Sequence, residues 1–355
     1  MNDGATMLRE RLEDAGYFAA YSQLGDGNFR SYDWEKMAPA LPETTRMLWH
    51  FFLLGAKVPR ADIRKLIGES ALRFLRGHGL CRNHGRDISM GPLVLISHRE
   101  LVFFAEQGRD PAGYFGEDTK ALMTLLPCHG TGRCLVLYPG CGAAALPLVT
   151  KGGGHCDFAE GLFNKQLIEA NLRLADSTGP GGFPEERIRR GKNPYDLILA
   201  TVPSLVEPPG FRLSQVIAGG RDGRRELQRT LALARKRLAP EGQLLAVFIF
   251  FAENDSAKMR QRLEGFLGAD GLDYSLTICS KHLMEIGVPI HNLILSAAAS
   301  SGGDAAQAAA RMQRHLKHLR YEAAYLIKGR FFRQRRPARH EIMDFSDLYY
   351  GGWTF

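Results

Sequence analysis

From about residue 114 onward, short apolar runs alternate with amphipathic segments, and this alternation limits the possible folds of the 355-residue chain more than any other feature. The runs at 134–140, 195–203 and 243–252 have the length and composition of buried strands. The segments 162–176 and 224–242 repeat apolar residues about every 3.6 positions, which predicts helices. Alternating strands and helices predict a doubly wound α/β domain around a mostly parallel sheet.

Two further runs, 274–280 and 323–331, predict closing strands that pair as an antiparallel edge. We therefore expect a seven-stranded Rossmann-like domain over residues 113–335, followed by a tail at 336–355.

The first third of the chain predicts mainly helices. An amphipathic helix over 43–55 ends at Gly55, and two short helices and a β-ribbon follow over 58–98. This order is typical of a winged helix, so we expect a helical, winged-helix-like domain over residues 1–112. Residues 70–77 lack the asparagine and glutamine that read bases, which favours a packing or lid module over DNA binding.

Composition narrows the class of protein. No apolar run approaches the ~18 residues of a membrane span, and the charged amphipathic N-terminus does not resemble a signal peptide. Six cysteines without a CxxC pair predict reduced thiols and a cytoplasmic protein. Neither His282 nor His291 has a partner at metal-ligand spacing, so no metal is expected.

The net charge of +8 is concentrated near 221–237 and 328–340. Such segments can bind nucleic acid, but solvated helix faces and a basic loop are the preferred interpretation. An anionic small substrate would also suit this charge.

A glycine turn follows the first predicted strand. Tyr138 and Pro139 lead into Gly140, Cys141 and Gly142, where missing side chains let the backbone approach a ligand. The N-terminus of the next helix would favour a negative group. The turn lacks both G-x-G-x-x-G and the Gly-Lys-Ser/Thr of a P-loop, which argues against nicotinamide, flavin and P-loop nucleotide sites.

Two more strand ends should lie at the same edge of the sheet. Glu160 comes twenty residues after Gly140, the distance at which an acid can accept hydrogen bonds from ribose hydroxyls, and Asp157 is its competitor. Residues 200–204 form a polar break after an apolar strand.

Residues 114–251 resemble class I S-adenosylmethionine (SAM) dependent methyltransferases, above all the "methyltransferase small" branch with a winged-helix-like N-terminal domain. The matching segments are YFGEDTKALMTLLP (114–127), YDLILATVPSLVEPP (195–209) and the run from the GGRDG loop to the fifth strand (217–248). The resemblance implies SAM as the cosubstrate or substrate.

The resemblance also implies the residues of the site. We expect SAM along Tyr138 to Gly142, with Glu160 on the ribose, and Tyr114 and Phe115 stacked near the ligand unless they are core aromatics. The residues expected to contact SAM are Tyr114, Phe115, Tyr138, Pro139, Gly140, Cys141, Gly142, Glu160, Thr201, Val202 and Pro203. The candidate catalytic residues are Tyr138, Thr201 and Ser204.

Two departures of the chain from the family pattern bear on the reaction; a third, the lack of the usual acid between Ala175 and Tyr195, leaves the adenine contact unassigned. Thr201-Val202-Pro203-Ser204 replaces the Asn-Pro-Pro-aromatic motif, which argues against methylation of adenine, guanine or glutamine amides. Tyr138 replaces an acid that would raise the pKa of the SAM amine. A deprotonated amine could attack its own γ-carbon, which would give azetidine-2-carboxylate and methylthioadenosine. The alternative is that Tyr138 only packs.

The resulting expectation is a SAM-dependent enzyme of small-molecule, specialised metabolism, with methyl transfer to a nitrogen, oxygen or carbon nucleophile as the default reaction. SAM cyclisation without a second substrate is the first alternative. An RNA or nucleic-acid methyltransferase or binding protein is the second, although a nucleic-acid partner is not expected. The sequence does not predict an oligomeric state.

Overall fold

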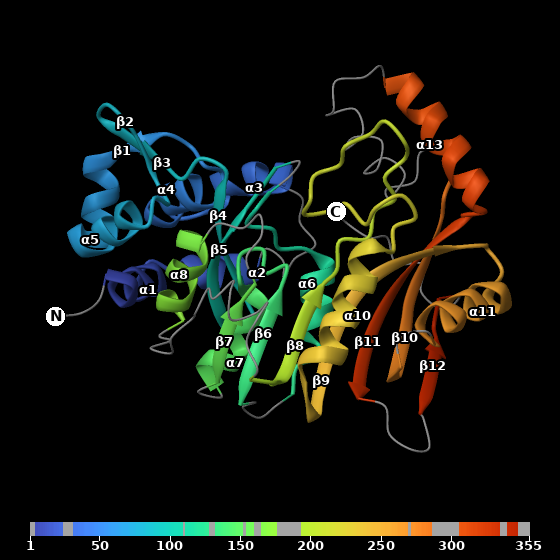
Figure 1. Ribbon diagram of the computed structural model, residues 1–355. Helices are drawn as coiled ribbons and strands as arrows, with labels where there is room; N and C mark the ends of the chain where they lie inside the picture. The colour runs from blue at the N-terminus through green and yellow to red at the C-terminus, as the bar shows by residue number, and fades with distance from the viewer. Residues whose placement is uncertain are drawn as a thin grey trace.

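The computed structural model describes residues 4–23, 31–108, 111–127, 132–151, 154–159, 165–175, 193–268, 271–285, 305–333 and 339–346. A seven-stranded sheet carries helices on both faces, and the helical N-terminal part packs beside one edge of it (Figure 1). The predicted α/β, Rossmann-like fold class is confirmed.

The sheet has the strand order β12-β10-β11-β9-β8-β6-β7. Strands β7, β6, β8 and β9 run parallel, whereas β11 is antiparallel to both β9 and β10. The bounds are β6 Arg133–Leu137, β7 His155–Phe158, β8 Tyr195–Thr201, β9 Leu238–Ala252, β10 Leu272–Leu283, β11 Ala323–Arg333 and β12 His340–Asp344.

The predicted antiparallel pair β10–β11 is present, but it does not form the edge of the sheet. Strand β12 takes that edge by pairing in parallel with residues 274–278 of β10. Its residues fall in the segment predicted as a tail, because a short edge strand of alternating exposure has little apolar signal. The helix predicted over 224–242 ends at Arg237, since Leu238 is already extended and Pro240 follows it.

Both faces of the sheet are covered, which explains why its strands are apolar throughout. Helices α10 (Arg225–Arg237) and α11 (Ser256–Leu267) bury Leu231 and Leu263 on one face. The other face packs against α6 (Glu117–Met123), α7 (Leu146–Lys151) and α8 (Lys165–Leu174). Helix α13 (Ala305–Leu319) buries Met312 and Leu316 against a smaller cluster.

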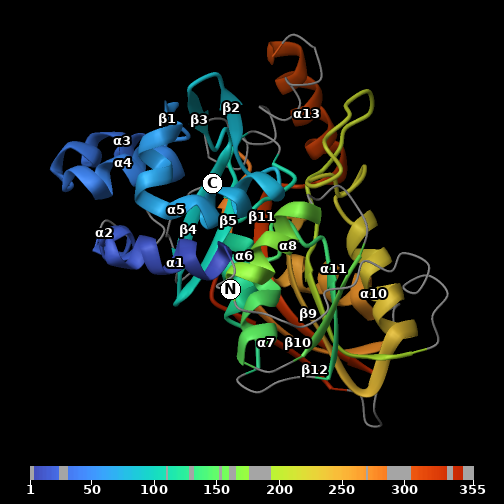
Figure 2. The same ribbon diagram turned by 90° about the vertical axis from the view of Figure 1, so that its left-hand side faces the viewer.

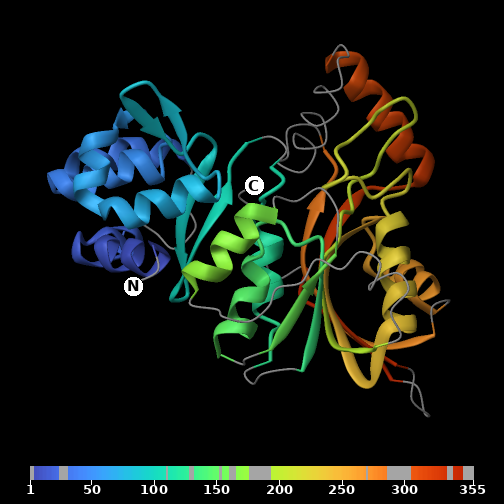
Figure 3. The ribbon, with the colours of Figure 1, turned by 60° about the vertical axis from the view of Figure 1, so that its left-hand side comes forward.

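The N-terminal part is built from short helices and two small sheets (Figure 3). Strands β1, β3 and β2 form one sheet in that order, and β4 and β5 form a hairpin. Helix α5 bends at Gly68, whose φ of 84° and ψ of 162° are not helical. The bounds are α1 Gly4–Asp14, α2 Tyr17–Gln23, α3 Ser31–Met37, η1 Ala38–Ala40, α4 Glu43–Phe52, β1 Val58–Pro59, α5 Arg60–Gly77, β2 Arg82–His84, β3 Asp87–Ser89, β4 Leu93–His98 and β5 Leu101–Glu106.

One hydrophobic core joins the N-terminal part to the sheet. It runs from Leu8 and Phe52 through Phe104 to Val136 and Leu199 without interruption. The predicted domain boundary near residue 112 therefore has apolar contacts across it, and independent folding of the two parts stays a prediction. No helix in the described ranges is long and apolar enough to cross a membrane.

Candidate functional site

The glycine turn at the carboxyl end of β6 is tightly packed against two other elements. A Cβ at Gly140 would lie 2.5 Å from the Tyr114 carbonyl oxygen, and one at Gly142 would lie 3.2 Å from Cγ2 of Ile168 on α8. Gly140 and Gly142 have φ of +53° and +83°. The Cys141 amide donates to the Tyr114 carbonyl at 3.3 Å. Glycine is required here because the turn has neither the space nor the backbone conformation for a side chain.

Asn171 on α8 holds this turn from the other side. Its Nδ2 donates to the carbonyl oxygens of Cys141 and Phe104, both at 2.8 Å, and its Oδ1 accepts from the Phe104 amide at 2.7 Å. The side chain is completely buried. Asn171 therefore ties the turn to strand β5 of the N-terminal part. Sequence reasoning missed it, although a polar residue on the apolar face of the predicted helix was a signal.

The helix that follows the turn is short. A 3-10 turn, η2 (Ala143–Ala145), precedes the six-residue α7, which has proline at its second position. We therefore assign no anion-binding role to a helix dipole at this point.

Tyr138 points toward α10. Its φ is +53°, and its hydroxyl donates to Glu226 Oε2 at 3.2 Å and lies 3.4 Å from Thr230 Oγ1. Burial, with a smaller contribution from Glu226, raises the pKa of Tyr138 to about 12. The phenol stays protonated at neutral pH and cannot act as a general base. These contacts favour the packing interpretation of Tyr138.

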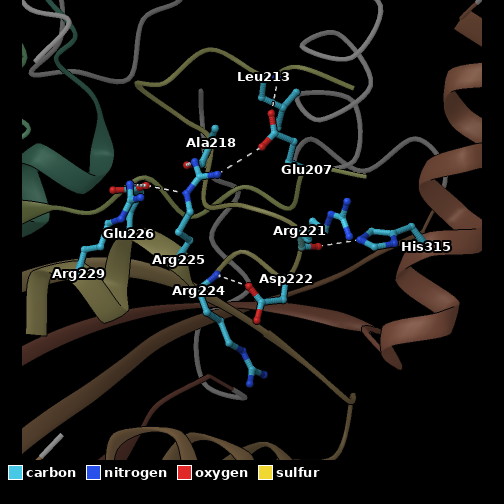
Figure 4. A network of polar contacts seen from close by, with 10 residues as sticks. All are labelled: Glu207, Leu213, Ala218, Arg221, Asp222, Arg224, Arg225, Glu226, Arg229 and His315. Atoms are coloured by element: carbon cyan, nitrogen blue, oxygen red, sulfur yellow. Dashed lines mark hydrogen bonds and ion pairs between the residues drawn. The ribbon is translucent and has the colours of Figure 1, made fainter. Parts of the chain in front are cut away.

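Glu226 belongs to a network of charges that holds the GGRDG loop (Figure 4). Its Oε1 accepts from Arg225 Nε at 2.8 Å and from Arg229 Nη1 at 2.9 Å. Arg225 also donates to the Ala218 carbonyl and lies 3.8 Å from Glu207 Oε2. The loop before α10 is thereby fixed to the segment after β8.

The end of β8 contains the other candidate catalytic residues. Thr201 Oγ1 donates to the Tyr138 carbonyl at 3.3 Å, so it links the ends of β8 and β6. Ser204 is buried, and its hydroxyl donates to the Val202 carbonyl at 2.6 Å. A Cβ at Gly223 would lie 2.7 Å from the Ser204 carbonyl oxygen. The Ser204 hydroxyl therefore stabilises a buried turn, and the catalytic role of Ser204 stays a prediction.

Tyr114 and Phe115 precede α6 and behave differently from each other. The Tyr114 hydroxyl hydrogen-bonds the Asp118 carboxyl group, and burial raises the pKa of the phenol well above its usual value. The Phe115 ring packs edge-on against Phe103, with 4.8 Å between centroids. Phe115 is thus a core aromatic between the two parts of the chain, whereas Tyr114 contacts the glycine turn through its carbonyl.

Asp118 is a candidate functional residue that sequence reasoning missed. Burial raises its pKa to about 6, in spite of hydrogen bonds from Thr119 and Tyr114 that lower it. The Thr119 amide donates to Asp118 Oδ1 at 2.6 Å. A carboxyl group with this pKa can exchange a proton near neutral pH. Its sequence signal is weak, because an acid in the first turn of a helix is common.

Of the two carboxylates proposed to bind the ribose, Glu160 and Asp157, the structure describes only Asp157. Glu160 lies outside the described residues. Asp157 is buried and receives hydrogen bonds, all at 2.9 Å, from Arg133 Nη2, His155 Nε2 and the Tyr195 hydroxyl. Arg133, His155 and Tyr195 begin their strands, so Asp157 faces the amino end of the sheet. These contacts favour a structural role for Asp157.

The parallel strands β7, β6, β8 and β9, with the antiparallel β11 between β9 and β10, define a Rossmann-like α/β fold. No protein-family model and no curated protein matches the sequence. Solved structures with a similar arrangement include Trm5b from Pyrococcus abyssi, at 10% identity and a TM-score of 0.38 over 71% of this chain. The chain covers only 62% of the length of that Trm5b.

Two other solved structures show a comparable level of similarity. TYW2 from M. jannaschii, in complex with AdoMet, is 9% identical, with a TM-score of 0.36 over 68% of this chain and 87% of its own. The [4+2]-cyclase SpnF is 15% identical, with a TM-score of 0.36 over 61% of this chain and 79% of its own.

Proposed function

We propose that the protein is a SAM-dependent transferase that binds SAM across the carboxyl ends of β6, β7 and β8. The observation that supports this proposal is the glycine turn, which stands at the site where open α/β sheets bind ligands. Its backbone is held by the Tyr114 carbonyl and by Asn171, so the turn is preorganised. The resemblance of residues 114–251 to SAM-dependent methyltransferases supports SAM over other ligands.

Residues of this chain fit such a ligand in distinct roles. Gly140 would present its backbone to it, and Cys141 would hold the turn in place, since its amide and carbonyl bond to Tyr114 and Asn171. Thr201 would keep the ends of β6 and β8 together through its bond to the Tyr138 carbonyl. SAM would supply the electrophilic methyl group. Asp118 would accept the proton that a nucleophile loses, because its pKa of about 6 leaves most of it ionised at neutral pH.

The default reaction is methyl transfer to a small-molecule nucleophile. Cyclisation of SAM is the second candidate, and it rests on the lack of an acid at position 138, not on the Tyr138 hydroxyl. The family has an acid at position 138, beside the amine of SAM. This chain has Tyr138 there, and its hydroxyl is already bonded to Glu226 and close to Thr230. Without that acid the SAM amine would lose its proton more easily and become nucleophilic.

Calorimetry with SAM and with NAD tests the cofactor class. We expect SAM to bind and NAD not to bind; binding of NAD alone would refute the proposal. Incubation with SAM, followed by mass spectrometry, separates the two reactions. Methylthioadenosine and azetidine-2-carboxylate from SAM alone would establish cyclisation, and S-adenosylhomocysteine formed only with an added cell extract would establish methyl transfer.

The matched pair Tyr138→Asp and Tyr138→Phe tests the role of this position in cyclisation. Restoring a carboxylate should suppress cyclisation and preserve SAM binding, whereas phenylalanine should preserve both. Equal cyclisation by both variants would show that residue 138 does not control the SAM amine.

A further inference from the structure

Positive charge is concentrated in one segment of the N-terminal part. Residues 57–86 contain eight lysines and arginines but only two acids, whereas residues 1–56 contain five basic residues and eight acids. All eight basic side chains are exposed. They are Lys57, Arg60, Arg64, Lys65, Arg73, Arg76, Arg82 and Arg86.

The fold brings several of these residues together. Strand β1 pairs with β3, and the Arg60 amide donates to the Arg86 carbonyl at 3.0 Å. The start of α5 therefore lies next to the turn of the β2–β3 hairpin, as Figure 2 shows. Arg64 is one helical turn beyond Arg60 on the same face of α5. Lys57, directly before β1, adds a further charge to this basic surface.

These charges are not neutralised by the protein itself. Within the described part of the chain, none of the eight side chains forms an ion pair. On α10, by contrast, Arg225 and Arg229 both pair with Glu226. Unpaired like charges repel one another. An anionic partner would relieve this repulsion, so the basic surface is complementary to such a partner.

The extent of the surface indicates the size of the partner. Exposed basic residues stand on both halves of α5, on either side of the bend at Gly68, and on the β2–β3 hairpin. Charges spread over three segments suit an extended polyanion better than a compact anion. A duplex carries a charge about every 1.7 Å of its axis and can contact all of it.

We propose that the basic surface formed by α5 and the β2–β3 hairpin binds the phosphate backbone of a nucleic-acid duplex. Arginine and lysine side chains suit phosphate contacts, which position a protein without reading sequence. Among the exposed side chains of residues 57–86, Asn83 is the one amide that could read a base, whereas eight are cationic. Binding should therefore depend mainly on charge, and it goes beyond the proposed function because it does not require SAM.

Fluorescence anisotropy with labelled RNA and DNA duplexes of about 20 base pairs, at about 50 and 200 mM salt, tests the proposal. The variant Arg60→Gln/Arg64→Gln/Lys65→Gln/Arg86→Gln removes four charges from the basic surface. The control Arg235→Gln/Lys236→Gln/Lys258→Gln/Arg260→Gln removes four exposed charges from α10 and α11. Both variants have the same net charge, and circular dichroism confirms that each is folded.

Of the RNA and DNA duplexes, one should bind the unmodified protein more tightly. We expect the surface variant to bind that duplex at least about tenfold more weakly, with a shallower salt dependence. The control should lose less than about twofold in affinity for it. The preferred duplex identifies RNA or DNA as the source of the phosphates. Three results would overturn the proposal: no binding by the unmodified protein at low salt, equal losses in the two variants, or equally tight binding of an acidic polypeptide. SAM calorimetry on the same samples reports separately on the proposed function.

Discussion

The two ends of the central sheet each contain a tyrosine bonded to an aspartate, in opposite surroundings. At the amino end, the Tyr195 hydroxyl donates to Asp157, and Arg133 and His155 bind the same carboxylate. At the carboxyl end, Tyr114 bonds to Asp118, which receives its other hydrogen bonds from Thr119. The same pair of groups contacts arginine at the amino end, whereas the hydrogen bonds that Asp118 receives from Tyr114 and Thr119 come from uncharged groups.

The difference separates a structural carboxylate from one suited to proton transfer. The guanidinium groups of Arg133 and Arg237 also lie 4.8 and 5.3 Å from the Tyr195 ring centroid, so the amino-end pair is enclosed by cations. Asp157 thereby joins the starts of β6, β7 and β8. Burial instead raises the pKa of Asp118 to about 6. A tyrosine–aspartate contact alone does not identify function; its electrostatic surroundings do.

Removing the amino-end carboxylate should have the largest effect. Asp157→Ala leaves Arg133 and Tyr195 without their shared acceptor inside the protein, and should lower the free energy of unfolding by about 3–5 kcal/mol. The control Asp196→Ala removes an exposed side chain that accepts from the Arg133 amide, and should cost about 1 kcal/mol. Urea unfolding measures both; a smaller loss for Asp157→Ala than for the control would contradict the structural role.

Disturbing the carboxyl end should instead reduce ligand binding. Gly140→Ala places a methyl group against the Tyr114 carbonyl at a positive φ, and should weaken SAM binding about a hundredfold. Gly265→Ala is the matched control, because a Cβ there meets nothing within 4 Å inside helix α11. Calorimetry measures the SAM affinity of both variants. Equal affinity in Gly140→Ala and Gly265→Ala would contradict our assignment of the site.

The raised pKa of Asp118 gives a pH-dependent prediction. An acid whose folded pKa of about 6 exceeds its usual 3.8 binds protons more tightly in the folded state. Its ionisation therefore destabilises the fold as pH rises from about 4 to 6, and the cost persists above that range. Asp118→Asn should remove this slope and raise the free energy of unfolding at pH 8 by about 1–3 kcal/mol.

Unfolding at a series of pH values tests this prediction, with Glu117→Gln as the control because Glu117 pairs with Lys120 on the surface of the same helix. The control should keep the slope. If Asp118 is also the base, Asp118→Asn should lower kcat and abolish its dependence on pH near 6. A retained pH slope in the stability of Asp118→Asn would show that another group titrates there.

The smallest effect is expected at Tyr138. Tyr138→Phe removes the hydroxyl that contacts Glu226 and Thr230, and should cost about 1 kcal/mol of stability. SAM affinity should change by less than about threefold, because the hydroxyl is directed at α10. A hundredfold loss of affinity would show that the phenol contacts the ligand and that its role is not limited to packing.

The sequence alone predicted the α/β class, the parallel strands and the glycine turn. These features depend on local patterns: β6 and β8 are apolar because helices cover both faces, and residues 140 and 142 require conformations that suit glycine. The apolar run of β11 and its pairing with β10 were also visible, but its insertion between β9 and β10 was not, since pairing with the distant strand β9 leaves no local signal.

The site residues depended on tertiary structure. Asp118 and Asn171 look like ordinary helix residues until burial raises the pKa of one and surrounds the other with backbone groups. Position 138 was correctly singled out as unusual, yet only the packing of α10 decided where its hydroxyl points. Periodicity and turn chemistry are local properties, whereas burial, charge pairing and side-chain direction depend on which distant segments meet.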